Sequence, residues 1–293
     1  MKYSVTHRTT FQYSEPARDN VNEVRLGPLP TAHQAPDFFL LNVIPATRLR
    51  KFTDLFSNPV HQFELVHPHN RLVIESRSIV SVGNTVHYDD LPYGISHHDL
   101  PALRRSEECH EFLQDSTYVR RSPEIWRKAI DIMGESTDVF QTAYALMQSI
   151  YEECSYVAGV TDSTTTAQAA FEVKRGVCQD FAHLLLAYCR CLNIPARYAS
   201  GYIWDPGHDR GKDVMRGSQA SHAWVEVFIP THGWVGLDPT NNKVVNEQYV
   251  LVATGRDYDD VAPVRGTFYG GGHHRSMQVH VEVRRLNGNG DTL

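Results

Sequence analysis

The sequence predicts an α+β protein in which a β-sandwich-like N-terminal domain precedes a helix-and-sheet domain. Three observations support this. Residues 1 to about 90 alternate between apolar and polar, a helical apolar repeat follows Cys178, and the strand-like segments beyond it carry His222 and Asp238. We therefore expect a β-rich domain at 1–95, a helical linker at 96–135, and a second domain at 136–293. In the second domain, a helix bearing the cysteine packs on an antiparallel sheet bearing the histidine and the aspartate.

The composition is that of a globular chain. Hydrophobic residues make up 41% and charged residues 21% of the 293 residues, which is enough for two ordinary domains. The net charge of −6 and the pI near 6.2 argue against a nucleic acid or an anionic membrane as partner. We expect a peptide or protein substrate, and self-association is left open.

Location follows from what the sequence lacks. No apolar run approaches the ~20 residues that span a bilayer, and the first residues contain no apolar signal-peptide region. Five cysteines are an odd number and do not form a disulfide framework. We therefore expect a cytoplasmic protein with reduced thiols.

The N-terminal domain shows strand patterns without a chemical motif. Tyr3, Val5 and His7 alternate with polar residues, and residues 72–82 read as a long strand. His67 and His69 could share one face of a strand, but no cysteine or aspartate clusters with them. We therefore expect neither a metal nor another cofactor.

Helices are expected in the linker and at the start of the second domain. Pro123 suits the first turn of a short linker helix. Asp138 is an N-cap candidate for a helix over 138–153, whose apolar residues recur at steps of three and four.

The next helix is the central element of the second domain. It is expected to begin at Cys178 and to end near Asn193, before Pro195. A helix N-terminus carries unpaired N–H groups and the positive end of the dipole, both of which favour a thiolate. Gly176 is expected to supply backbone freedom just before the helix.

A base for this thiol is expected on the strand 221–229. From residue 223 onward, its odd-numbered residues are all apolar, so that face should be the packed one. His222 lies on the other face and can point into a cleft. A symmetric hairpin centred on His232 would pair Asp238 with Glu226, so a contact between His222 and Asp238 requires an asymmetric turn or a bulge. Asn242 remains an alternative orienting group, because Cys-His-Asn sites exist.

These segments resemble a known family. Residues 176–183 (GVCQDFAH), 222–226 (HAWVE) and 238–240 (DPT) are similar, in this order, to motifs of the bacterial transglutaminase-like superfamily, whose members are often described as cysteine proteases. The resemblance covers roughly residues 136–245. The N-terminal part also resembles the β-rich domain that precedes such cores, through Tyr3, His7, Tyr13 and residues 54–58, although Ser57 stands where that domain has glycine.

The resemblance implies a papain-like core with a catalytic triad. It assigns the nucleophile to Cys178, the base to His222 and the orienting role to Asp238, and so favours Asp238 over Asn242. The implied activity is thiol-dependent hydrolysis of peptide, amide or isopeptide bonds through a thioester. An acyltransferase on the same triad and a non-catalytic scaffold are the alternatives. Weaker candidates for oxyanion or substrate contacts are Gln179, Tyr156 and Trp224.

Overall fold

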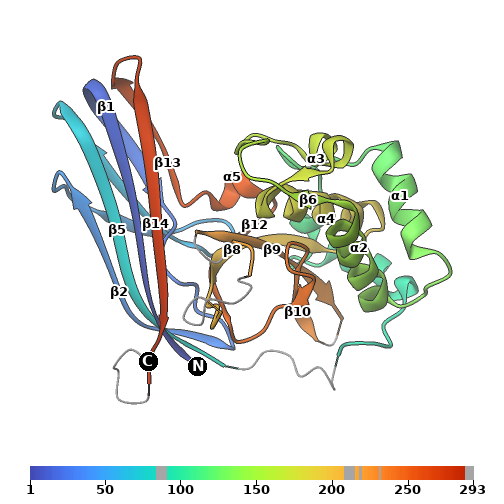
Figure 1. Cartoon of the computed structure of the whole chain (residues 1–293). Helices are drawn as coiled ribbons and strands as arrows, with labels where there is room; N and C mark the ends of the chain where they lie inside the picture. The colour runs from blue at the N-terminus through green and yellow to red at the C-terminus, as the bar shows by residue number, and fades with distance from the viewer. Residues whose placement is uncertain (84–90, 208–214, 218–219, 231, 288–293) are drawn as a thin grey trace.

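A curled antiparallel sheet lies beside a mixed helix-and-sheet core (Figure 1). The computed structural model describes residues 1–83, 91–207, 215–217, 220–230 and 232–287. These residues confirm the α+β fold class. The helical segments are η1 (His97–Arg105), η2 (His110–Leu113), α1 (Pro123–Met133), α2 (Val139–Glu153), α3 (Ala167–Val173), α4 (Cys178–Cys191) and α5 (Tyr258–Val261).

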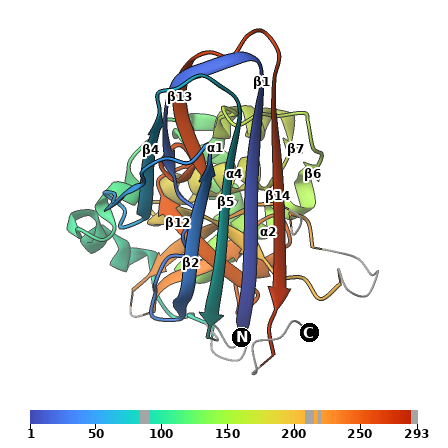
Figure 2. The ribbon, with the colours of Figure 1, turned by 90° about the vertical axis from the view of Figure 1, so that its left-hand side faces the viewer.

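The N-terminal sheet is organised by its long first strand. The first half of β1 pairs with β5 and β14, and its second half pairs with β4 and β13. The pairing with β5 shifts register between Gln12 and Ala17, so β1 bends and the sheet curls around an apolar cluster that includes Leu26, Phe63 and Ile74 (Figure 2). The predicted β-sandwich-like domain is thus a single sheet that curls back on itself. Its strands are β1 (Lys2–Val24), β2 (Gln34–Ile44), β3 (Arg50–Thr53), β4 (Pro59–Leu65), β5 (His69–Val82), β13 (Val264–Gly270) and β14 (Arg275–Arg285).

The chain returns to this sheet at its C-terminal end. The sequence assigned residues 136–293 to the second domain, but β13 and β14 both pair antiparallel with β1. That boundary was therefore wrong for 264–285. A strand pattern shows which residues form a strand, whereas its hydrogen-bonding partner can lie anywhere in the chain.

The second sheet has the order β11-β10-β9-β8-β12. As predicted, the apolar odd-numbered residues of β9, from Ala223 to Ile229, are buried in the core that α4 shares. The strands are β8 (Ala196–Ile203), β9 (His222–Ile229), β10 (Gly233–Asp238), β11 (Lys243–Val244) and β12 (Tyr249–Gly255), and a separate parallel pair consists of β6 (Ser155–Tyr156) and β7 (Arg175–Gly176).

Helix α4 is buried on all sides rather than on one face. Every residue from Asp180 to Cys191 is buried, because α1, α2 and α3 pack around the helix and β8 and β9 cover the remaining side. The predicted helix starts are confirmed, since Pro123 begins α1 and the Asp138 side chain accepts the Gln141 N–H at 2.7 Å. No helix of the described residues is long and apolar enough to cross a membrane.

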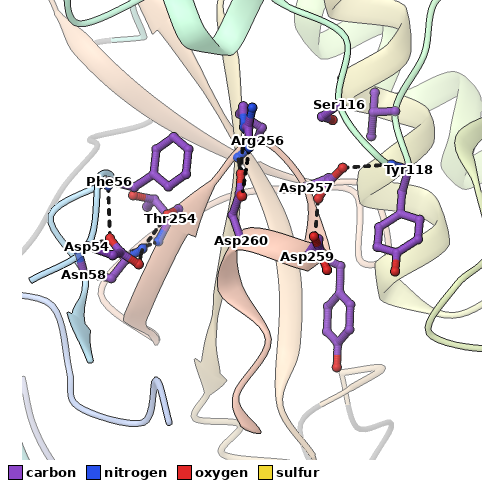
Figure 3. A network of polar contacts seen from close by, with 12 residues as sticks. Asp54, Phe56, Asn58, Ser116, Tyr118, Thr254, Arg256, Asp257, Asp259 and Asp260 are labelled. Atoms are coloured by element: carbon purple, nitrogen blue, oxygen red, sulfur yellow. Dashed lines mark hydrogen bonds and ion pairs between the residues drawn. The ribbon is translucent and has the colours of Figure 1, made fainter. Parts of the chain in front are cut away.

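The N-terminal sheet is joined to the core by two side-chain amides on the outer edge of β12. Gln34 accepts the Leu251 N–H at 2.8 Å and donates to the Leu251 carbonyl at 2.7 Å. Asn58 makes the same pair of bonds with Thr254, both at 2.8 Å (Figure 3). Each amide thus pairs with backbone groups at a sheet edge, where the Leu251 carbonyl also accepts the Leu29 N–H at 3.0 Å.

A second group of polar contacts fixes the far end of β12. Asp257 accepts the Tyr118 N–H at 2.8 Å, and Arg256 pairs with Asp260 at 2.9 Å (Figure 3). Arg190, buried on α4, donates to Ser116, to the Val119 carbonyl and to the Arg256 carbonyl. The linker, α4 and β12 are therefore held together at this point.

We predict that Asn58→Ala destabilises the protein by roughly 2–3 kcal/mol, because the buried N–H and C=O of Thr254 would each lose a partner. Chemical denaturation with urea measures the free energy of unfolding. Asn70→Ala, at an exposed position of β5, is the matched control and should change it by less than about 0.5 kcal/mol. Equal effects of the two substitutions would contradict this role of Asn58.

We predict that Ser57→Gly stabilises the protein by about 0.5–1 kcal/mol. Ser57 has a φ of +64° in the turn that positions Asn58, and this left-handed conformation costs a residue with a Cβ about 1–2 kcal/mol, part of which glycine loses again in the unfolded chain. The same denaturation measurement applies. A lower stability of the glycine variant would show that the backbone freedom of the unfolded chain outweighs the strain.

Candidate active site

Cys178 is the first residue of α4, as the sequence predicted, and its side chain is half-buried. The helix start is closed by Asp180, whose Oδ2 accepts the Val177 N–H and the Thr161 hydroxyl, both at 2.7 Å. Burial raises the pKa of Asp180, and these hydrogen bonds oppose that shift. The nucleophile candidate therefore stands at a helix N-terminus whose geometry is fixed by its own first turn.

The glycine before this helix has a different role from the predicted one. Gly176 is absent from the residues with positive φ, so backbone freedom is not what its position requires. A Cβ at Gly176 would instead lie 2.3 Å from Oδ2 of Asp180. Glycine is needed here because the carboxylate that caps α4 occupies the space of a side chain.

His222 and Asp238 are in contact. The Nε2 of His222 lies 2.9 Å from Oδ2 of Asp238, and both side chains are completely buried. The hairpin expectation was wrong by two residues: Gly236, not Asp238, is opposite Glu226. Continuing this register places Asp238 opposite Trp224, so His222 is its diagonal neighbour on the same face, and no bulge is required.

Asp238 receives four further hydrogen bonds. Its Oδ2 accepts from the Tyr249 hydroxyl and from Nδ2 of Asn241, both at 2.8 Å. Its Oδ1 accepts the N–H groups of Thr240 at 2.9 Å and of Asn241 at 3.3 Å. The sequence analysis missed Asn241 and Tyr249. Asn241 could have been found from its place three residues after Asp238, whereas nothing around Tyr249 marks it.

The alternative orienting group, Asn242, takes a different position. It has a φ of +52° in the turn between β10 and β11, and its buried Oδ1 has no partner among the described residues. The carboxylate beside His222 is thus that of Asp238.

The two partners shift each other's protonation. Burial acts to lower the pKa of His222, but Asp238 and Cys178 together raise it above its ordinary value. Burial acts to raise the pKa of Asp238, but His222, Asn241 and Tyr249 hold it below its ordinary value. Nδ1 of His222 has no hydrogen-bond partner among the described residues, so it is the ring nitrogen available to exchange a proton with Cys178.

The three weaker candidates take different positions. Tyr156 pairs with Gly176 two residues before the cysteine, and burial together with Cys178 raises its pKa to about 12, so it stays protonated and can donate a hydrogen bond. Gln179 is engaged elsewhere, since its Nε2 donates to the Ser163 carbonyl at 3.1 Å. Trp224 is buried and stacks on His222 with ring centroids 6.3 Å apart, so it packs against the imidazole.

The other four cysteines, all within the described part of the chain, are buried and free. Burial raises the pKa of Cys109, Cys154 and Cys191 to about 11 and that of Cys189 to about 12. Cys178 is therefore the one cysteine with an accessible side chain.

Two buried histidines outside the site, His69 and His183, have structural partners. His69 is buried, with its Nδ1 2.9 Å from the His67 carbonyl and its Nε2 3.3 Å from Nδ2 of Asn20. His183 is fully buried against Tyr118, between the Thr165 carbonyl and the Tyr258 N–H.

Comparison with known proteins shows which families this part of the chain is similar to. Residues 127–239 match the profile of the Transglutaminase-like superfamily, and residues 3–81 match the Bacterial transglutaminase-like N-terminal region. An uncharacterised protein of Mycobacterium leprae is 34% identical over 284 residues, which cover 96% of this chain and 98% of that protein.

Two further similarities concern activity. The crystal structure of a candidate cysteine protease from Cytophaga hutchinsonii has a TM-score of 0.77 and 26% identity, and the match covers 98% of this chain and 91% of that chain. A protein-glutamine gamma-glutamyltransferase of Pseudomonas aeruginosa is 33% identical over 70 residues, which are 24% of this chain and 10% of that protein. The superfamily and the Cytophaga neighbour support a cysteine-dependent hydrolase or acyltransferase.

We predict that Asp238→Asn lowers the pKa of His222 from above to below its ordinary value of about 6.5, because burial then becomes the dominant influence. An NMR titration of the histidine Cε1–H signals, with His222 assigned by His222→Ala, measures this. Cys178→Ala is the control and should leave the pKa raised. A His222 pKa below 6.5 in the wild-type protein would contradict the ion pair.

The same shifts set how stability depends on pH. The raised pKa of His222 stabilises the fold at pH values below its unfolded pKa of about 6.5, and this contribution disappears as pH rises through the folded value. The lowered pKa of Asp238 contributes above about pH 3.9 and is lost as pH falls through its folded value.

Proposed function

The chain belongs to the transglutaminase-like superfamily, and on that premise we propose that it is a thiol-dependent hydrolase of peptide, amide or isopeptide bonds. Cys178 is the nucleophile, His222 the base and acid, and Asp238 the group that orients and stabilises the charged imidazole. The observation that supports this most is the buried contact of 2.9 Å between His222 and Asp238, beside a cysteine at a helix N-terminus.

The resting site is proposed to be a thiolate–imidazolium pair. The raised pKa of His222 keeps a proton on the ring at neutral pH. A thiolate at Cys178 is favoured by this cation and by the unpaired N–H groups at the start of α4. The proton on Nδ1 then lies on the side of the sulfur, because Nε2 is bonded to Asp238.

Acylation follows from this arrangement. The thiolate adds to the amide carbonyl, and N–H groups at the start of α4 stabilise the oxyanion, with the Tyr156 hydroxyl as a further donor. The C–N bond then breaks, and Nδ1–H of His222 protonates the departing amine. A thioester remains on Cys178, and His222 is left neutral.

Deacylation uses the neutral imidazole as a base. His222 removes a proton from a water molecule, the oxygen adds to the thioester carbonyl, and the C–S bond breaks to release a carboxylic acid. The thiolate and the imidazolium are thereby restored. If a primary amine takes the place of water, the same steps transfer the acyl group and form a new amide.

Acyl transfer is therefore the second candidate function. The observation that favours it is the local similarity to the Pseudomonas protein-glutamine gamma-glutamyltransferase. Incubating β-casein with the protein, with and without dansylcadaverine, distinguishes the reactions: new N-termini indicate hydrolysis, and fluorescent casein indicates transfer. A scaffold role is the third reading and predicts neither product.

The cellular setting remains a proposal as well. A cytoplasmic location, with a peptide or protein substrate, agrees with five free cysteines.

We predict that iodoacetamide alkylates Cys178 much faster than the buried cysteines at neutral pH, and that His222→Ala slows this reaction by roughly 100-fold. Mass spectrometry of the cysteine peptides measures both rates. The four buried cysteines serve as internal controls, and thermal unfolding shows whether the variant is folded.

Cys178→Ala is expected to abolish all casein turnover while leaving the unfolding midpoint nearly unchanged. Retained turnover in this variant would exclude the mechanism. Slow labelling of Cys178, equal to that of the buried cysteines in both proteins, would instead support the scaffold reading.

A further inference from the structure

A short segment, residues 215–217, lies directly against the triad. A Cβ at Gly217, whose φ is +85°, would lie 2.3 Å from Nδ1 of His222. Only glycine allows the backbone to come this close to the imidazole. The residue before it, Arg216, therefore stands at the edge of the site.

The backbone of Arg216 is tied to the triad through Asn241. The Arg216 N–H donates to Oδ1 of Asn241 at 2.9 Å, and Nδ2 of Asn241 donates to the Arg216 carbonyl at 3.2 Å. The same Nδ2 donates to Oδ2 of Asp238 at 2.8 Å. The position of Arg216 is thus set by the residue that also holds the buried carboxylate.

The side chain of Arg216 is held over two tyrosine rings. Its Cζ lies 5.5 Å from the ring centre of Tyr151 and 5.9 Å from that of Tyr156. Tyr156 is also influenced by Cys178, and the thiol and the guanidinium have opposite effects on the pKa of its hydroxyl. The guanidinium and the nucleophile are therefore both neighbours of one phenol.

Arg216 differs from Arg197, which also stacks on an aromatic ring near the sheet. Arg197 lies over Trp234 but also pairs with Glu226 at 2.7 Å. Arg216 is exposed, and no carboxylate of the described residues lies within ion-pair distance of it. With no such partner in the described part of the chain, its planar fork of N–H donors can bind a carboxylate from outside the protein.

We propose that Arg216 binds a carboxylate of the acyl donor, so that the preferred substrates are acidic peptides or isopeptides with a negative charge close to the scissile bond. This inference rests on the proposed function, because it assumes that the acyl donor reaches Cys178. Arg216 is then a specificity-determining residue that contacts substrate, and Tyr151 and Tyr156 set the direction of its side chain.

The test compares two alkylating reagents that differ mainly in charge. Iodoacetate and iodoacetamide each form a C–S bond with the Cys178 thiolate and release iodide, but only iodoacetate carries a carboxylate. The ratio of their rates cancels any change in the amount of thiolate. We expect Arg216→Gln to lower the iodoacetate-to-iodoacetamide ratio by roughly three- to tenfold, and Arg216→Lys to lower it less.

Two controls complete the experiment. Arg71→Gln, at an exposed position of β5 in the N-terminal sheet, should keep the wild-type ratio. Adding 0.5 M NaCl should bring the wild-type ratio toward that of Arg216→Gln, because salt screens exposed charges.

The outcomes separate the two proposals. If iodoacetamide labels Cys178 no faster than the buried cysteines, the proposed function fails. If iodoacetamide labels Cys178 rapidly but the ratio is the same in wild type and Arg216→Gln, the proposed function stands and the carboxylate site is overturned. A lowered ratio in Arg216→Gln and not in Arg71→Gln supports the site.

Discussion

A buried negative charge is the constraint on which the rest of this structure depends. The carboxylate of Asp238 is inaccessible to water, and a charge so placed is tolerated only when it is paired and fully hydrogen-bonded. Its five donor contacts come from β9, from the turn after β10 and from β12. Three separate parts of the chain must therefore be in place before the charge is stabilised, and the same arrangement orients His222.

This requirement explains why the N-terminal sheet belongs to the working unit. Tyr249, which donates to Asp238, begins β12, and the outer edge of that strand is held by Gln34 and Asn58. Tyr3 and Val5 of β1 are part of the same apolar cluster as α4. The curled sheet thus supports the strand that completes the candidate site. Within this sheet, β14 pairs with the first half of β1 and β13 with its second half.

The nucleophile side of the site is rigid for a related reason. Asp180 closes the first turn of α4, Gly176 leaves the space that its carboxylate occupies, and the helix is enclosed on every side. Opposite it, Trp224 stacks on His222 and the backbone of Gly217 lies close to the imidazole. Cys178 and His222 therefore approach each other from two elements with little freedom to move, as preorganised catalysis requires.

The sequence by itself determined the local features: the starts of α1, α2 and α4, and the buried face of β9. Each follows from a pattern within about a dozen residues, because helices and strands have fixed periods. The resemblance of three motifs to a known family predicted the transglutaminase-like core. Only the tertiary structure decided the hairpin register, the clash that requires Gly176, the donors Asn241 and Tyr249, and the sheet to which residues 264–285 belong. These depend on which segments meet in space, and hydrogen bonds such as those from Gln34 to β12 join residues that no local pattern relates.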